Sequence, residues 1–137
     1  MRKLLLITLL FSGVAAWSGD SADVIGNWEG ESKCTVAGSP CHDEHVVYHI
    51  ETDKQNAGKL TIGADKIVNG KEEFMGNISC VYHAEESLLS CTIPDFKQEN
   101  LWEFHISGES MTGTLVLGPD KKLYRRVSLR RVREKKS

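Results

Sequence analysis

Residues 77–94 read NISCVYHAEESLLSCTIP, and this stretch decides the fold of the chain. Two short segments rich in apolar and β-branched residues, 77–84 and 87–94, flank a polar turn, which is the pattern of an antiparallel hairpin. When residue 84 pairs with residue 87, Cys80 lies directly opposite Cys91, because the residue numbers of paired positions in an antiparallel hairpin always add up to the same value. Directly opposed Cβ atoms are ~4.5–5.5 Å apart, close to the spacing that a disulfide requires. We therefore expect a hairpin bridged by these two cysteines.

Similar short segments recur through the remainder of the chain, separated by turn residues and almost without helical periodicity. Consecutive strands with short turns favour an all-β, antiparallel up-and-down barrel of about eight strands over residues 17–132, since closure removes exposed sheet edges. A two-sheet sandwich is the alternative, but it requires a long crossover that the sequence does not offer. Only residues 71–75 suggest a short helix. The expected strands are residues 24–34, 44–52, 59–64 with 66–68, 77–84, 87–93, 101–106, 111–117 and 123–132.

The chain opens with two basic residues, an apolar run from Leu4 to Phe11 and small residues up to Ala16. This order predicts a secretory signal peptide over residues 1–16, with later cleavage near Gly19 or Ala22 as the alternative. The apolar run is too short to cross a bilayer, which takes about 20 residues. We therefore expect a secreted or periplasmic protein without a transmembrane segment.

Export changes how the four cysteines are interpreted, because exported proteins keep disulfides. Four cysteines allow three pairings, and we expect the two local bridges, Cys34–Cys41 and Cys80–Cys91. Zinc binding is the alternative, but neither spacing is C-x-x-C and oxidised sulfur is a poor zinc ligand.

Length and charge limit the function classes. A chain of 137 residues makes one domain, and its 40% hydrophobic content excludes a disordered protein. A net charge of -2 argues against a nucleic-acid partner. The charge is unevenly spread, with an acidic body and a basic end that includes a tail over residues 133–137. We expect the last strand to lie among acidic neighbours, and contact with an anionic lipid surface is the alternative.

The first expected strand carries the sequence GNWEG at residues 26–30, which resembles the G-x-W motif on the first strand of lipocalins and the wider calycin group. The resemblance implies that Trp28 plugs one end of the barrel while an arginine of the last strand packs over it. Arg125 and Arg131 are our candidates for that arginine. Gly26 and Gly30 would let neighbouring backbone approach, so this set is expected to be structural.

Two further resemblances leave the family open. The haem-binding nitrobindin-like barrels share the G-x-W-x-G opening, although they are longer and no histidine here stands out as an axial ligand. The first cysteine loop, residues 34–44, is similar to that of small secreted bacterial proteins of unknown function. We identify the chain as a suspected member of the lipocalin-like small secreted barrels.

A barrel of eight strands can hold one small ligand or be filled by its own side chains. We expect a monomeric, non-catalytic protein without a cofactor that binds a small apolar molecule inside. The alternative is an envelope or extracellular interaction or inhibitor module with a solid core, which would bind a protein through residues 39–45 or 94–100. The expected interior residues are Val47, Ile62, Leu89, Trp102, Phe104 and Leu115, together with Trp28 and Val127.

The densest polar cluster contains His42, His45 and His49. His45 and His49 share one strand face but lie about 13 Å apart at ~3.3 Å per residue, too far to ligate one metal. His42 and His45 could bind zinc or copper if the loop turns, yet we expect a surface cluster without a metal. The sequence has no G-x-S-x-G, no P-loop and no H-E-x-x-H, so we do not expect an enzyme.

Overall fold

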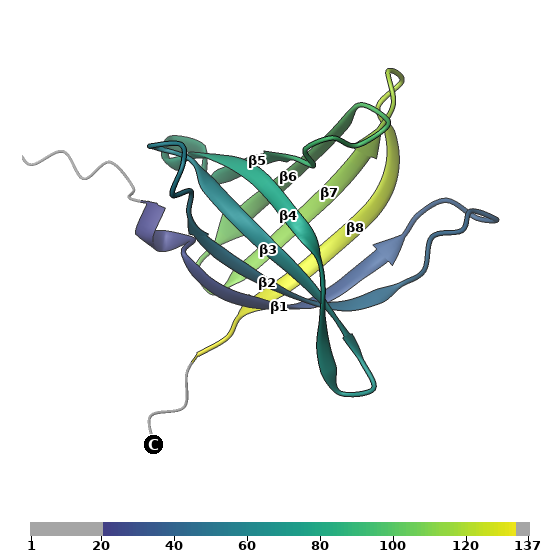
Figure 1. Cartoon of the computed structure of the whole chain (residues 1–137), viewed down its shortest axis with the longest axis horizontal. Helices are drawn as coiled ribbons and strands as arrows, with labels where there is room; N and C mark the ends of the chain where they lie inside the picture. Colours follow the sequence, from purple (N-terminus) through teal and green to yellow (C-terminus); the bar gives the residue numbers. More distant parts are fainter. Residues whose placement is uncertain (1–20, 134–137) are drawn as a thin grey trace, which may run out of the picture.

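The computed structural model describes residues 21–133 and contains one closed barrel in which each strand is antiparallel to its neighbours (Figure 1). The barrel closes because β1 pairs with β8 as well as with β2, which confirms the predicted up-and-down topology and excludes the sandwich. The predicted signal peptide and the last four residues of the tail lie outside the described residues. The elements are η1 (Ser21–Asp23), β1 (Gly26–Cys34), β2 (Glu44–Thr52), β3 (Leu60–Val68), β4 (Lys71–His83), η2 (Ala84–Glu86), β5 (Leu88–Thr92), β6 (Asn100–Ser107), β7 (Ser110–Leu117) and β8 (Lys122–Arg131).

Both predicted disulfides are present. Cys80 and Cys91 are paired across β4 and β5 and are bridged, and both are buried in the core. Cys34 and Cys41 close the connection between β1 and β2, which projects beyond the barrel wall in Figure 1. In the described part of the chain no helix is long and apolar enough to cross a membrane.

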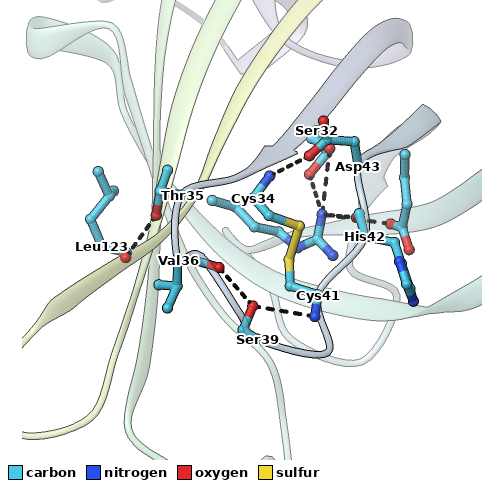
Figure 2. Close-up of a disulfide and its surroundings, with 11 residues drawn as sticks. Ser32, Cys34, Thr35, Val36, Ser39, Cys41, His42, Asp43 and Leu123 are labelled. Atoms are coloured by element: carbon cyan, nitrogen blue, oxygen red, sulfur yellow. Dashed lines mark hydrogen bonds and ion pairs between the residues drawn. A yellow bond between two sulfur atoms is a disulfide. The ribbon is translucent and has the colours of Figure 1, made fainter.

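Hydrogen bonds fasten the loop closed by Cys34 and Cys41, as Figure 2 shows. The Ser39 hydroxyl donates to the Val36 carbonyl at 3.0 Å and accepts from the Cys41 amide at 3.3 Å. The Thr35 hydroxyl donates to the Leu123 carbonyl at 2.8 Å, which ties this loop to the beginning of β8. The pairing of β1 with β8 closes the barrel and is called the barrel seam. The β1–β2 connection is therefore anchored to β8, across this seam.

Apolar side chains at alternate, inward-facing positions of the strands pack into a core inside the barrel. Trp102 and Phe104 are stacked, with ring centroids 5.5 Å apart, and Tyr48 meets Phe104 edge-on at 6.1 Å. Most of the expected interior positions lie in this core, namely Trp28, Ile62, Leu89, Trp102, Phe104, Leu115 and Val127.

Val47 is the exception, and its expected interior position is wrong. It pairs with Glu29 on one side and Asp65 on the other, so it lies on the outer face, while Val46 and Tyr48 point inward. Three consecutive large residues occupy this part of β2, and the pattern alone does not fix which face is inside.

One end of the barrel, called the closed end, is covered by Trp28 and Arg131. The Arg131 guanidinium carbon lies 4.4 Å from the centre of the indole, and its nitrogens donate to the Ile25 and Asp23 carbonyls. The Trp28 Nε1 donates to the Val24 carbonyl at 2.9 Å. Arg131 is thus the arginine that the G-x-W resemblance implies.

Gly30 lies on β1 directly against the backbone of β8. A Cβ atom at this position would stand 1.9 Å from the Ser128 carbonyl oxygen, a distance that no side chain tolerates. Only glycine allows the two terminal strands to close the barrel here.

The helix expected over residues 71–75 is also absent, because these residues begin β4. The turn at Asn69 and Gly70 pairs Val68 with Lys71, and the hairpin ladder continues along residues 71–74. Cross-strand pairing therefore overrides the helical propensity of this segment. A β-bulge between Ala64 and Asp65 interrupts this pairing.

Candidate functional site

The end of the barrel opposite Trp28 is open and contains a cavity of about 350 Å³, called the cup below. It lies where the inner faces of the strands reach the β1–β2, β3–β4, β5–β6 and β7–β8 connections. Ile78, Ile93, Trp102 and Leu115 supply an apolar wall, and Met75 and Phe96 reach the rim with 42% and 44% of their surface exposed. This arrangement combines an apolar interior with direct access from solvent.

A polar group forms one side of the cup. The Arg125 Nη1 donates to the Ser32 hydroxyl at 3.2 Å and to the His42 carbonyl at 3.1 Å, and it lies 3.9 Å from the Glu44 carboxylate. Arg125 uses this one nitrogen for all of these contacts, so among residues 21–133 its Nε and Nη2 have no hydrogen-bond partner. The Arg125 side chain is 14% exposed, and its guanidinium keeps donors for a further acceptor.

Arg125 was also a candidate for the arginine over Trp28, and the structure corrects this. Arg125 is opposite Cys34 in the β1–β8 ladder, whereas Trp28 is opposite Arg131. The two arginines share the inner face of β8 but lie six residues apart, so they serve opposite ends of the barrel.

Tyr48 lines the cup beside this polar group and is almost completely buried. Burial raises the pKa of its phenol well above the ordinary value, and the Glu44 carboxylate adds to this, while Arg125 and Ser32 act in the opposite direction. The phenol therefore stays protonated at neutral pH and acts as a neutral hydrogen-bonding group, not as a base.

Trp102 contributes the least satisfied polar atom of the described core. Its side chain lines the cup and is 5% exposed, yet its Nε1–H has no hydrogen-bond acceptor among the described residues. A buried donor left without a partner costs about 1–3 kcal/mol.

The β5–β6 connection at the rim is held by Asn100. Its side-chain oxygen accepts from the Ile93 amide at 2.6 Å, and its side-chain nitrogen donates to the Ile93 carbonyl at 3.3 Å. Phe96 belongs to this connection, so its exposed ring is carried by a loop that is fixed at its base.

The expected histidine cluster divides between two surface sites on the outer face of β2. The His45 ring lies between Glu31 and Glu29, with 2.7 Å from Nδ1 to one carboxylate and 2.7 Å from Nε2 to the other. These hydrogen bonds to Glu31 and Glu29 raise the pKa of His45 above its ordinary value. His42 does not join it, and contributes its backbone carbonyl to Arg125.

His49 has a different set of neighbours. Its Nδ1 lies 2.7 Å from Asn27 Oδ1, and its Nε2 lies 3.0 Å from Asp65 Oδ2 and 3.2 Å from Glu72 Oε2. Burial lowers the pKa of His49, but the Asp65 and Glu72 carboxylates outweigh this and raise it. Sequence reasoning did not connect these residues because they come from four different strands.

The polar side of the cup was missed as well, although one signal was present. Arg125, Val127, Leu129 and Arg131 alternate along β8, and that period of two places both arginines on the inner face. No family model matches this sequence, and no curated protein matches it. The barrel is compatible with a calycin-like fold, and the function must be argued from the cup itself.

Proposed function

We propose that this protein binds a small, mostly apolar molecule that carries a hydrogen-bond acceptor, in the cup at the open end of the barrel. The observation that carries the proposal is an apolar cavity open to solvent whose wall also holds Arg125, a guanidinium with hydrogen-bond donors to spare. A volume of about 350 Å³ is at the lower end of the range for small-molecule sites, roughly 300–1,000 Å³. The ligand would therefore be compact, with its acceptor near Arg125.

Binding without catalysis is part of this proposal. Tyr48 is held in its protonated form, and Glu44 and Arg125 face one another across 3.9 Å. Groups that neutralise each other position a ligand well but supply neither a general base nor a nucleophile. We also propose export and a lipocalin-like origin, which the two disulfides and the barrel topology support.

The experiment uses native mass spectrometry on protein purified from its own host, followed by titration with a panel of fatty acids, retinoids and haem. Leu115→Trp, which fills the cup, should abolish binding of whichever compound is retained. Val81→Trp is the matched control, because Val81 is exposed on the outer wall and adds the same bulk outside. A uniformly empty mass with no binding from the panel, or equal binding by both variants, would sink the proposal.

A protein partner is the second candidate, and the rim favours it. Phe74, Met75 and Phe96 are all exposed large apolar residues, and Met75 and Phe96 line the mouth of the cup. Such a group is typical of interaction surfaces. Replacing Phe74 by serine separates the two candidates, because Phe74 is 66% exposed and does not line the cup; the change should weaken capture of a partner while leaving small-molecule binding within a few fold.

A further inference from the structure

The outer wall of the barrel carries a second arrangement, separate from the cup. His49 on β2, Asp65 on β3 and Glu72 on β4 each direct one donor atom to a common point, and these atoms lie within 4.8 Å of one another. We infer that His49, Asp65 and Glu72 bind one divalent transition-metal ion, and that zinc fits them best. This inference does not depend on the proposed function of the cup.

The distances between the donor atoms suit zinc. Tetrahedral zinc with bonds of ~2.0–2.1 Å has ligand atoms about 3.3 Å apart. The Nε2 of His49 lies 3.0 Å from Asp65 Oδ2 and 3.2 Å from Glu72 Oε2, so two edges of the tetrahedron nearly exist. An ion would spread these three atoms by a few tenths of an ångström on these edges, and water would complete the coordination.

The orientation of the imidazole is fixed from the opposite side of the ring. Asn27 Oδ1, a neutral acceptor, lies 2.7 Å from Nδ1 and accepts its hydrogen bond. Without an ion, Nε2 donates to the two carboxylates, and a bound ion would take the place of that proton. A hydrogen bond from the second ring nitrogen is the usual support of a metal-binding histidine, and it keeps the proton on Nδ1 when Nε2 binds the ion.

The backbone explains how the three side chains converge. His49 is directly opposite Gly63, which has no side chain to separate His49 from its neighbours on β3. The pairing with β4 then shifts between Ala64 and Asp65, because Met75 is an extra, unpaired residue of β4, the strand that carries Glu72. Bulges redirect side chains and are frequent beside functional sites. Asp65 is also the best-buried carboxylate of the set, with 14% of its side chain exposed.

His45 is a natural control on the same face of the same strand. It also has two carboxylates within 2.7 Å, but Glu31 lies at one ring nitrogen and Glu29 at the other. The two carboxylates are therefore on opposite sides of the ring and cannot share one ion with it. An acidic surface that merely attracts cations would use His45 and His49 alike, whereas a chelating site requires His49.

The test measures Zn²⁺ and Co²⁺ binding to the chelator-treated protein by isothermal titration calorimetry and native mass spectrometry in slightly alkaline buffer. We expect one equivalent of Zn²⁺, and a Co²⁺ complex whose visible absorption is that of a four-coordinate ion with nitrogen and oxygen ligands. His49→Gln and Asp65→Asn should each weaken Zn²⁺ binding at least tenfold, while His45→Gln should leave it unchanged. Glu72→Gln, on the more exposed ligand, should give a smaller loss in the same direction.

Two outcomes would overturn the inference. The first is absence of stoichiometric Zn²⁺ binding at micromolar concentrations by a protein whose circular dichroism shows the native barrel. The second is an equal loss of binding in His45→Gln and His49→Gln, which would show diffuse attraction to an acidic surface. The variants change partly exposed side chains on the outer wall, and an unchanged thermal transition for each would show that folding does not account for the loss.

Discussion

Arg131→Met should destabilise the barrel strongly, although Arg131 lies on the basic last strand and not in the apolar core. The substitution keeps most of the aliphatic stem but removes the guanidinium that lies 4.4 Å from the buried indole of Trp28. It also removes the donors to the Ile25 and Asp23 carbonyls, which tie the segment before β1 to the end of β8. The closed end would lose the guanidinium that covers Trp28, and the segment before β1 would lose its hydrogen bonds to β8.

The magnitude follows from these contacts. A cation stacked on a buried indole contributes about 0.5–2 kcal/mol. Each hydrogen bond from a charged donor contributes about 1.5–3 kcal/mol, and the lower value applies here because water can replace the guanidinium at the two carbonyls. Allowing for the non-additivity of neighbouring contacts, we expect the free energy of unfolding to fall by about 3 kcal/mol.

Urea unfolding with both disulfides intact provides the assay. A loss of about 3 kcal/mol at a slope of about 1.5 kcal/mol per M lowers the midpoint by roughly 2 M. Arg130→Met is the matched control, because Arg130 is the exposed neighbour and makes no side-chain hydrogen bond or ion pair with residues 21–133. If the two variants unfold at the same urea concentration, the closed end does not depend on the arginine and the reasoning is wrong.

Three further predictions concern stability. Gly30→Ala should cost at least about 2 kcal/mol, because its Cβ would meet the Ser128 carbonyl oxygen at 1.9 Å, whereas Gly63→Ala, with no contact under 3.8 Å, should cost far less. Thermal unfolding of the pair decides this, and equal transitions would contradict it. Replacing both cysteines of the buried β4–β5 bridge by serine should lower the free energy of unfolding by about 3 kcal/mol, measured in urea. The ion pairs of His45, whose folded pKa is raised above 6.5, should stabilise fully below pH 6.5 and weaken as the pH rises through the folded value. His45→Gln should remove this dependence, which is worth only ~0.2–1 kcal/mol at an exposed site, and a variant with the same pH profile as the parent would refute the assignment.

The sequence predicted the barrel well because its decisive signals are local. The β4–β5 register follows from the positions of Cys80 and Cys91 around a short turn, and the structure pairs these two residues directly. The order of the strands follows from connections too short to cross the sheet. Closure then has a simple cause, since an open sheet of eight strands would expose two edges.

Predictions failed where local patterns conflict with pairing. Lys71 to Met75 have the composition of a helical turn, but the hairpin turn at Asn69 and Gly70 places them beside β3, where they form the first part of β4. Val47 was assigned to the interior because β2 is apolar on both faces at that point. Val47 is buried on the outer face because neighbouring residues on β1 and β3 cover it, and the sequence of β2 does not reveal these neighbours.

The polar groups of the cup could not be predicted because they meet only across the seam. Ser32 and Arg125 are 93 residues apart, and the pairing of the first and last strands brings them within 3.2 Å. The Trp102 Nε1–H lacks an acceptor because of how the core packs, and no sequence pattern predicts this. The convergence of three strands at His49 likewise depends on the bulge at Met75 in β4, opposite Ala64 and Asp65, whose position is visible only in the pairing.

Strand alternation separates the two proposed sites although they share β2. Tyr48 points into the cup, and the next residue, His49, points away from it on the outer wall. Successive side chains of a strand lie on opposite faces, so Leu115→Trp can fill the cup without contacting His49, and His49→Gln can remove a metal ligand without narrowing the cup. Each substitution is therefore a folding control for the other. If either variant abolished both activities, the loss would reflect damage to the barrel that both sites share, and not the removal of one binding side chain.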